Sequence, residues 1–361
     1  MTWNVLVLPG DGIGPEVTQE AVRVLEHVAA KWGHQARLQE ALLGGAAIHA
    51  TGSPFPERTR ELALESDATL LGAVGLPEFD SLPPAERPEK GLLGLRKALD
   101  VYANLRPVRC YDSLIDSSPL KNAIVQGTDI LIVRELTGGL YFGQPRGIEG
   151  AGPGETAVNS MVYTRHEIER VGRMAFGLAR QRRGRLTSVD KANVLENSQL
   201  WRGIMAQLSA EYQDVELDHM LVDNCAMQLL LRPADFDVVV TENLFGDILS
   251  DEASVLAGSI GMLPSASIGD RLPSGALRGL YEPVHGSAPD IAGQGLANPL
   301  AAIGSVAAML KYTFGLSEES ATVERAIGEV LASGTVTADL KPAGEPASTR
   351  EVGRAVCSAI G

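Results

Sequence analysis

Apolar residues along the chain fall either in short runs or at helical spacing. The short runs that predict buried strands are Val5–Leu8, Ala68–Val74, Ala123–Val133 (broken by Gly127) and Phe236–Thr241. Helical spacing predicts helices over residues 16–31, 165–182, 199–212 and 243–256. Residues 300–310 are rich in Ala and Gly, which is typical of a close-packed core helix. Alternating strands and helices favour an α/β fold with a mostly parallel sheet that has helices on both faces.

The segment Leu136–Val162 is longer than the connection that a compact domain needs between two elements. Its beginning is dense in Gly and other turn residues. Ordered loops of this length are usually functional or projecting. We expect an arm over about 136–162 that pairs with a partner subunit, and a plain surface loop remains the alternative.

Length and charge narrow the class of protein. The 361 residues are enough for about two domains. The formal net charge of -14 argues against nucleic acid or an anionic membrane as the main partner, because both would repel the chain. Three cysteines without a CxxC pair, and the lack of a basic leader or a long apolar span, favour a reduced, cytoplasmic protein.

The segment Gly10–Glu16 stands between a predicted strand and a predicted helix, where a dinucleotide fingerprint would stand. Its glycines follow a G-x-G-x-G-P pattern and not G-x-G-x-x-G. Pro15 suits a first helical turn, and the Glu16 carboxylate would disfavour a pyrophosphate there. We therefore interpret the segment as a structural turn, and not as a Rossmann site.

The segment Thr241–Glu252 carries the strongest local signal. On a helix, Asp247 and Asp251 are four residues apart and project together, which is unfavourable without a compensating cation. All-oxygen ligation suits Mg²⁺ or Mn²⁺, and Asp223 can supply a third carboxylate. A solvated acidic face is the alternative interpretation.

Three arginines lie where a dicarboxylate would be bound. Arg106 follows an apolar run, Arg134 ends a predicted strand, and Arg96 stands in a Leu-rich segment. Open α/β sheets bind ligands at strand ends, and guanidinium groups match carboxylates bidentately. Surface ion pairs are the alternative for each arginine taken singly.

Two further side chains can carry protons. Lys191 follows an apparent strand, and a nearby dication would disfavour its ammonium form, which would make it a base. Tyr141 can donate a proton. Taken alone, either residue is more often structural.

The turn-rich loop Tyr281–Ile291 contains small residues together with His285 and Asp290. Such a loop can hold an adenosine, with Asp290 accepting hydrogen bonds from ribose hydroxyls. His285 can equally be a structural loop histidine.

Together these motifs resemble the isocitrate/isopropylmalate dehydrogenase superfamily of metal-dependent β-decarboxylating dehydrogenases, most closely its branch that acts on 3-isopropylmalate in leucine biosynthesis. The segments that carry the resemblance are Gly10–Glu16, Leu92–Pro107, Arg134–Gly147, Val189–Arg202, Val222–Leu229, Thr241–Ser254, Gly258–Ala266 and Glu282–Pro299. The resemblance implies that family's two-domain α/β fold, which is not a Rossmann fold. It implies a discontinuous cofactor domain, 1–101 plus 258–361, and a dimerisation and substrate domain, 102–257. It also implies a homodimer with shared active sites, in which Lys191, Val194 and Asp223 reach into the partner's cleft.

The resemblance also implies a role for each candidate residue. Asp247 and Asp251, with Asp223 of the partner, would hold Mg²⁺ or Mn²⁺ on the 2-hydroxyl and adjacent carboxylate of a 2-hydroxy-3-alkylsuccinate. Lys191 would take the hydroxyl proton while hydride leaves for NAD. Arg96, Arg106 and Arg134 would clamp the carboxylate that departs as CO₂, and Tyr141 would protonate the resulting enolate.

The resemblance also implies a choice of substrate and of cofactor. Leu92, Leu93 and Val194 would line an apolar hole for an isopropyl group, where isocitrate's third carboxylate would be costly to bury. The expected cofactor contacts are Glu89, Asn193, His285, Gly286, Ser287, Ala288, Asp290, Ile291 and Asn298. The Asp290 carboxylate would repel a 2′-phosphate, which favours NAD over NADP.

Two other functions remain open at this point. The first is a tartrate, D-malate or homoisocitrate dehydrogenase of the same superfamily. Polar residues in place of Leu92 and Leu93 would suit such an enzyme better. A non-enzymatic binder of dicarboxylates or metals is the second, and it leaves Lys191 and Tyr141 without a role.

Overall fold

The computed structural model describes residues 1–84, 86–273 and 275–361. It divides into two units, which are unit 1 (Met1–Val101, Tyr111–Pro119 and Ala257–Gly361) and unit 2 (Tyr102–Cys110 and Leu120–Leu256). Residues 111–119 therefore group with unit 1, although they lie inside the predicted 102–257 domain. Ala85 and Ser274, within the predicted cofactor domain, lie outside the described residues.

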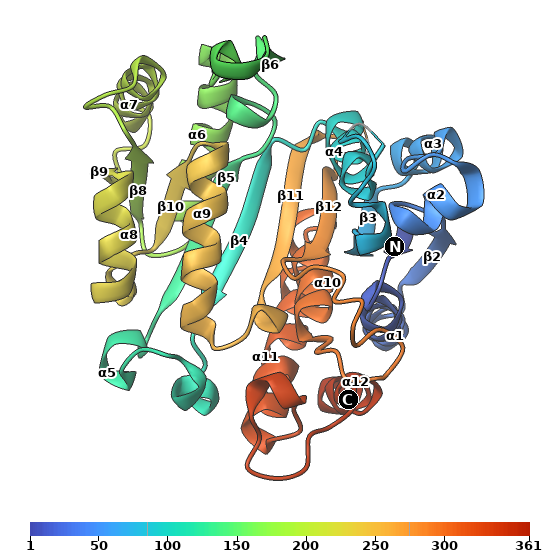
Figure 1. Cartoon of the computed structure of the whole chain (residues 1–361). Helices are drawn as coiled ribbons and strands as arrows, with labels where there is room; N and C mark the ends of the chain where they lie inside the picture. Colours follow the sequence, from blue (N-terminus) through green and yellow to red (C-terminus); the bar gives the residue numbers. More distant parts are fainter. Residues whose placement is uncertain (85, 274) are drawn as a thin grey trace. The chain divides into compact units, whose positions relative to one another are not determined.

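Unit 1 contains five strands and seven α-helices among its described residues (Figure 1). The strands are β1 (Thr2–Gly10), β2 (Gln35–Glu40), β3 (Ala68–Ala73), β11 (Pro264–Arg271) and β12 (Leu277–Pro283). The helices are α1 (Gly14–Trp32), α2 (Gly45–Thr51), α3 (Glu57–Glu65), α4 (Pro88–Leu99), α10 (Leu300–Tyr312), α11 (Ser317–Ser333) and α12 (Thr349–Ile360). The strand order is β2-β1-β3-β12-β11, in which only the β11–β12 pair is antiparallel.

The core of unit 1 follows from its apolar segments. Every residue of β3 is buried, as expected for a strand that has packing on both faces. Helix α10 buries nearly all its length, and its small residues let it pack closely against α1, α11 and two strands. Helix α1 begins with Pro15 in its first turn, and Gly33 ends it with φ +68°. The Gly10–Glu16 segment is thus the strand-to-helix turn that its spacing predicts.

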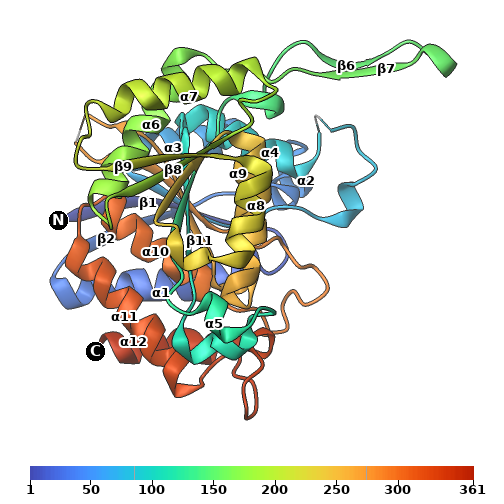
Figure 2. The same ribbon diagram turned by 90° about the vertical axis from the view of Figure 1, so that its left-hand side faces the viewer.

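Unit 2 contains five strands in the order β4-β5-β10-β8-β9, and a separate two-stranded hairpin. The strands are β4 (Ala103–Arg109), β5 (Asp129–Glu135), β8 (Arg185–Asp190), β9 (Glu216–Leu221) and β10 (Val238–Thr241). Only β4 runs antiparallel to its neighbour β5. The helices are α5 (Asn122–Val125), α6 (Arg165–Arg180), α7 (Glu196–Ser209), α8 (Val222–Leu231) and α9 (Asn243–Ser254). Helices α8 and α9 pack together on one face of the strands, with α6 and α7 on the other (Figures 1 and 2).

The hairpin of unit 2 is formed by β6 (Arg146–Glu149) and β7 (Thr156–Asn159). The two strands pair antiparallel, and all eight of their residues are exposed. Figure 2 shows the hairpin extending away from the strands and helices of its unit. It lies in the middle of the segment predicted to form an arm.

One predicted strand is partly wrong. The break expected at Gly127 is confirmed, because Gly127 turns the chain with φ +76°, but the part before the break, Asn122–Val125, folds as the short helix α5. The strand begins only at Asp129. An apolar run of this length does not distinguish one strand from a helical turn followed by a strand.

The described residues also form short 3₁₀ helices. These are η1 (Pro77–Phe79), η2 (Asp112–Ser117), η3 (Gly139–Tyr141), η4 (Gly152–Gly154), η5 (Pro233–Asp235), η6 (Val255–Ala257), η7 (Ile260–Met262) and η8 (Ala338–Leu340). No helix in the described part of the chain combines the length and apolar character needed to cross a membrane.

Candidate active site

Four adjacent strands of unit 2 place chemically active side chains at one edge of the sheet. Strands β5, β10, β8 and β9 are parallel, so their carboxyl ends lie at the same edge. Arg134 stands near the end of β5, and helix α9 follows β10. Lys191 directly follows β8, and Asp223 follows β9 in the first turn of α8. This edge is where open α/β sheets bind their ligands.

Helix α9 is fixed at its beginning by a buried carboxylate. Glu242 accepts hydrogen bonds from the backbone N–H groups of Leu244 (3.1 Å) and Phe245 (2.6 Å), which caps the helix. Tyr163 donates its hydroxyl to Glu242 at 3.1 Å. Burial raises the pKa of Glu242 despite these bonds. The beginning of α9 is therefore held in one orientation.

Arg134 lies against the first turn of α9. A Cβ atom at Gly246 would come within 2.8 Å of the Arg134 side chain, so glycine is required for this approach. The Arg134 side chain is only 3% exposed, and it donates from Nε (2.9 Å) and Nη2 (2.8 Å) to Oδ1 of Asn243. Its Nη1 forms an ion pair with Asp247. A buried guanidinium held in this way has its plane fixed before any ligand arrives.

Asp247 is the centre of this group. Besides Arg134, it accepts a 2.6 Å hydrogen bond from the Tyr141 hydroxyl, and Arg106 Nη2 lies 3.6 Å from its Oδ1. Burial acts to raise the pKa of Asp247, but the charges of Arg134 and Arg106 and the hydrogen bond from Tyr141 outweigh it, and the pKa is lowered. The group is therefore a carboxylate at neutral pH.

Arg106 connects the two helical aspartates. Its Nη1 donates to Ser250 Oγ at 2.6 Å and to Asp251 Oδ1 at 3.2 Å, and its Nε donates to Asn104 Oδ1 at 2.8 Å. Because Arg106 also contacts Asp247, the two carboxylates face the same side of α9. Asp251 is the more accessible of the two, with 64% of its side chain exposed against 32% for Asp247.

Tyr141 ends the 3₁₀ helix η3. Burial, followed by the hydrogen bond to Asp247, raises the pKa of Tyr141 to about 12. The phenol is therefore protonated at neutral pH and able to donate. The Arg134 guanidinium also lies over its ring, 5.5 Å from the centroid.

Lys191 and Asp223 form a separate pair at the ends of β8 and β9. Lys191 Nζ donates to Asp223 Oδ1 at 2.6 Å, and this hydrogen bond lowers the pKa of Asp223. Val194 lies in the same loop as Lys191 and is 61% exposed. Within the described part of this chain, no group of three His, Cys, Asp or Glu side chains is arranged to hold a metal ion. Asp223 thus does not form a metal site with Asp247 and Asp251 of the same chain. We expect it to complete the metal site of the partner subunit.

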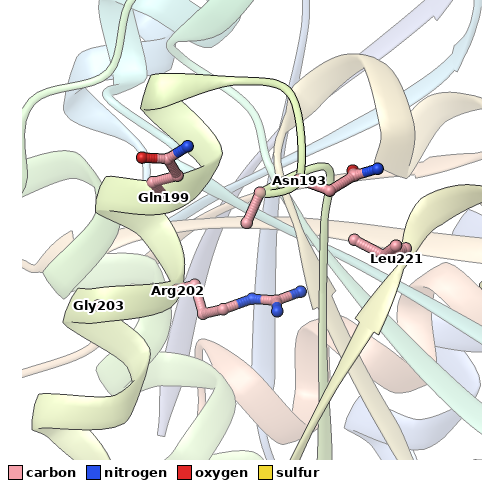
Figure 3. A pocket seen from close by; sticks show the side chains of 6 residues that line it. Asn193, Gln199, Arg202, Gly203 and Leu221 are labelled. Carbon is pink, nitrogen blue, oxygen red and sulfur yellow. The ribbon is translucent and has the colours of Figure 1, made fainter.

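Asn193 lines a surface pocket of about 530 Å³ beside this pair (Figure 3). Ala192, Gln199, Arg202, Gly203 and Leu221 complete its lining. The Arg202 guanidinium is paired bidentately with Asp190, at 2.8 and 2.9 Å. That pairing holds the end of β8 against α7.

Helix α4 carries the candidate specificity residues of unit 1. Glu89, Leu92, Leu93 and Arg96 follow at helical spacing on one face, and the two leucines are half-buried. Arg96 Nη2 donates to Glu282 Oε1 at 2.7 Å. Arg96 Nε is buried and has no hydrogen-bond partner among the described residues. Of the three candidate arginines, only Arg106 and Arg134 lie in unit 2 and share Asp247.

The loop after β12 carries most of the candidate cofactor residues. They are His285, Gly286, Ser287, Ala288, Asp290 and Ile291. The Asp290 side chain is exposed, and Ala288 adopts an unusual positive φ of +35°. His285 shares a hydrogen bond of 2.9 Å between Nδ1 and the Gly286 carbonyl oxygen, while its buried Nε2 has no partner in the described structure. The loop contacts the Gly10–Glu16 turn, because Ile13 N–H donates to Ser287 O at 2.8 Å.

Asn298 is engaged within unit 1. Its Oδ1 accepts from the Leu300 N–H at 3.0 Å, and its Nδ2 donates to Asp339 at 3.1 Å. It is also buried. Its side chain therefore holds the beginning of α10, next to the loop that contains the other candidate cofactor residues.

Sequence reasoning assigned no role to four residues that hold this site together. They are Asn104, Asn243, Ser250 and Glu282. Asn104 had a local signal, since residues two apart on a strand face the same side and Arg106 was already a candidate. Glu282 lies 186 positions from Arg96, so no local pattern connects them.

Comparison with known proteins places this geometry in a family. The family model described as isocitrate/isopropylmalate dehydrogenase matches residues 4–356. The chain belongs to the isocitrate/isopropylmalate dehydrogenase family. It is an α/β oxidoreductase of that family, as its motifs predict.

Relatives within the isocitrate/isopropylmalate dehydrogenase family cover nearly the whole chain. The 3-isopropylmalate dehydrogenase of Halalkalibacterium halodurans is 58% identical over 361 residues, covering 100% of this chain and 98% of the relative. That of Moorella thermoacetica is 60% identical over 356 residues, covering 98% of both chains. The crystal structure of isocitrate dehydrogenase from Methylococcus capsulatus has a TM-score of 0.85 and 35% identity, covering 99% of this chain and 98% of its own. The β-decarboxylating dehydrogenase of Thermococcus kodakarensis has a TM-score of 0.79 and 38% identity, covering 99% and 96%.

Proposed function

We propose that the protein catalyses the NAD-dependent oxidative decarboxylation of 3-isopropylmalate to 2-oxo-4-methylpentanoate, a step of leucine biosynthesis. The observation that carries this proposal is full-length identity of 55–60% to relatives named 3-isopropylmalate dehydrogenase. Two half-buried leucines beside Arg96 on α4 support it, because they offer an apolar surface next to a carboxylate-binding group. Three free cysteines suit a reducing cytoplasm.

The donor set of α9 fits Mg²⁺ or Mn²⁺. Asp247 and Asp251 offer carboxylate oxygens on the same side of the helix, and the lowered pKa keeps Asp247 ionised. Hard dications prefer such oxygen ligands. Asp223 of the partner would complete the set. When bound, such an ion would acidify the substrate 2-hydroxyl and would stabilise negative charge on that same oxygen in the enolate.

Side chains of the protein bind the leaving carboxylate and transfer the protons. Arg106 and Arg134, already oriented by Asn104 and Asn243, receive the substrate carboxylate that leaves. In unit 1, Arg96 is a further candidate donor to a carboxylate, because its Nε has no hydrogen-bond partner among the described residues. Lys191 of the partner takes the hydroxyl proton. Tyr141, protonated at neutral pH, delivers a proton to the carbon from which CO₂ departs.

The loop after β12 fits NAD. The buried Nε2 of His285 has no hydrogen-bond partner among residues 1–84, 86–273 and 275–361, and the exposed Asp290 carboxylate suits ribose hydroxyls while repelling a 2′-phosphate. Glu89, Ser287 and Asn298 are further candidate contacts in unit 1, and Asn193 is a candidate contact in unit 2. NAD⁺, when bound, accepts the hydride from the substrate carbon that bears the hydroxyl.

A homodimer with shared sites completes the proposal. Apolar side chains are exposed on neighbouring helices α8 and α9 and directly after them: Met227 (54%), Leu231 (65%), Ile248 (56%) and Val255 (49%). The hairpin adds Ile148, which is 72% exposed. Exposed apolar side chains on two helices that pack together favour an interface at this face. A second copy covering it would bring Lys191, Val194 and Asp223 to the partner's site.

A turnover assay tests the substrate. The purified protein is incubated with Mg²⁺, NAD⁺ and, in separate reactions, 3-isopropylmalate, D-malate, tartrate, homoisocitrate and isocitrate, and NADH absorbance is followed. We expect the highest kcat/KM with 3-isopropylmalate and rejection of isocitrate, whose third carboxylate meets Leu92 and Leu93. Faster turnover of D-malate, tartrate or homoisocitrate than of 3-isopropylmalate would assign the protein to another branch of the family.

The variant Asp290→Lys tests the cofactor contact. We expect the ratio of kcat/KM for NADP⁺ to that for NAD⁺ to rise by about tenfold or more, because a cation replaces the carboxylate that repels the 2′-phosphate. An unchanged ratio would remove Asp290 from the ribose site. The exposed Glu345→Lys change in the same unit is the matched charge control.

A further inference from the structure

Asn243 connects two groups that the proposed reaction needs, which are the Arg134 guanidinium and the segment that leads to Tyr141. Its side chain is fully buried at the first position of α9. Its Oδ1 accepts both Nε and Nη2 of Arg134, at 2.9 and 2.8 Å. Its Nδ2 donates to the carbonyl oxygens of Leu136 (3.2 Å) and Gly138 (3.0 Å). One amide thus uses its acceptor on the arginine and its donors on the segment after β5.

The segment after β5 leads directly to Tyr141. We define the Tyr141 loop as residues 136–141, which run from the end of β5 through η3. Backbone N–H groups of this loop donate to Glu135 from Thr137 (2.9 Å) and Gly138 (2.8 Å). Asn243 supplies donors to the carbonyl side of the same loop. The loop is therefore held from both sides of its backbone, although it contains only a short 3₁₀ helix.

Tyr163 holds Asn243 in turn. The Asn243 backbone N–H donates to the Tyr163 hydroxyl at 2.9 Å, and that hydroxyl donates to Glu242. A Cβ atom at Gly138 would come within 2.7 Å of the Tyr163 ring, so ring and loop are in close contact. Asn243 is thus fixed by its own backbone as well as by its side chain.

We infer that Asn243 is a positioning residue, which sets the Arg134 guanidinium and the Tyr141 loop in one fixed relation. The inference deepens the proposed function and rests on it for the roles of Arg134 and Tyr141. An amide is suited to this place because it is an acceptor at one end and a donor at the other. A carboxylate would keep the acceptor for Arg134 but turn an oxygen toward the carbonyls of Leu136 and Gly138.

That difference separates the two functions of the amide. In Asn243→Asp, we expect Arg134 to keep its partner, so that KM for 3-isopropylmalate changes by no more than about threefold. The Tyr141 loop loses its donor, and we expect kcat to fall by about 100-fold because a proton donor displaced by an ångström is poorly aligned. In Asn243→Ala both contacts are lost, and we expect KM to rise as well.

Thr241→Val is the matched control. Thr241 is fully buried two positions before Asn243, and its hydroxyl donates to the Val189 carbonyl at 2.9 Å. The control therefore removes a buried side-chain hydrogen bond near the same strand end. Thr241 pairs with Arg134 through the β10–β5 ladder, but the hydroxyl that is removed bonds to Val189 and not to the Arg134 side chain or the Tyr141 loop. We expect kcat and KM within about threefold of the starting protein.

Amide hydrogen exchange of the Tyr141 loop gives a readout that does not depend on activity. We expect faster exchange over residues 136–141 in Asn243→Asp and Asn243→Ala, and unchanged exchange in Thr241→Val. Lower kcat without faster loop exchange, or faster exchange with unchanged kcat, would overturn the inference. If the aspartate variant does not fold, Asn243→Ser decides, because its hydroxyl is too short to reach both partners.

The outcome also distinguishes this inference from the proposed function. Absence of turnover by the unsubstituted protein with every acid tested would refute the proposed function. The exchange measurement would then decide alone whether Asn243 holds the loop. Turnover by the unsubstituted protein, with both variants behaving like Thr241→Val, would refute the positioning role only.

Discussion

Two parts of unit 2 follow the same sheet edge but differ in how completely one chain builds them. We call Arg134, Tyr141, Asn243 and Asp247 the inner cluster, and Lys191, Val194 and Asp223 the outer rim. The Arg134 side chain is 3% exposed, whereas that of Asp223 is 61% exposed. The inner cluster is organised within a single chain. The outer rim presents its groups to the outside.

The difference has a physical cause. A buried guanidinium is stable only when hydrogen bonds and opposite charge replace the lost water, so Arg134 must be fully bonded for the chain to fold. The Lys191–Asp223 pair remains in water, where such pairs contribute little to stability. Free of a structural role, the rim groups can exchange this partner for a ligand or a second subunit. This contrast supports our proposal that one chain prepares half of the site and that a partner supplies the rest.

The largest expected effect is that of Asp247→Asn in the inner cluster. We expect turnover to fall by about 10³-fold or more, since the variant lacks a carboxylate that would hold the divalent ion, and the ion would stabilise the developing negative charge. The dimer should remain intact, because Asp247 is not part of the exposed apolar face. NADH formation and analytical ultracentrifugation measure the two properties. Loss of the dimer in this variant would make Asp247 structural.

Complementation between inner cluster and outer rim tests whether the site is shared. Lys191→Met and Asp247→Asn should each be inactive alone. After mixed refolding in equal amounts, half of the dimers contain one of each chain, and in a shared arrangement one of their two sites is intact. Activity should then recover to about one quarter of the unsubstituted value. Recovery of no activity would place both residues in a site built by one chain.

A smaller effect is expected at the hairpin. Replacing the exposed Ile148 by Lys places a charge on the surface that the partner is proposed to cover. We expect the dimer Kd to rise by about tenfold, as for the loss of a typical interface contact, with activity falling only at low protein concentration. Leu42→Lys, at an exposed apolar residue of unit 1, is the control. Equal Kd values for the two variants would exclude the hairpin from the interface.

The smallest effect concerns His219 on β9, next to the outer rim. Burial, followed by the charge of Arg202, lowers the pKa of His219 below its ordinary value near 6.5. The unfolded chain therefore binds more protons below about pH 6.5, and the free energy of unfolding decreases there as pH falls. We expect His219→Gln to reduce this decrease by less than about 1 kcal/mol, measured by urea unfolding between pH 5 and 8. An identical pH dependence in both proteins would contradict the assignment.

The inner cluster was partly predictable from the sequence. The spacing of Asp247 and Asp251 places both carboxylates on one helix face, and Arg134 at the end of an apolar run indicates a ligand-binding edge. Asn243 gave no such signal, since an Asn at the start of a helix is usually read as a cap. Asn243 and its partner Arg134 are 109 positions apart in the chain. The strand expected over 123–133 was wrong before Gly127 for a related reason. A local apolar run does not distinguish a helical turn from the beginning of a strand.

The sequence alone determined the family, the α/β class and the kinds of side chain available for the reaction, because motif spacing and hydrophobic period are local properties of the chain. Only the tertiary structure decided which charges meet. In unit 2, Asp247 is shared by Arg134, Arg106 and Tyr141. In unit 1, Arg96 and Glu282 pair with each other. These choices depend on strand order and helix packing, which bring together residues more than a hundred positions apart. Burial then makes each pairing obligatory, since a charge left without its partner in the core would destabilise the fold.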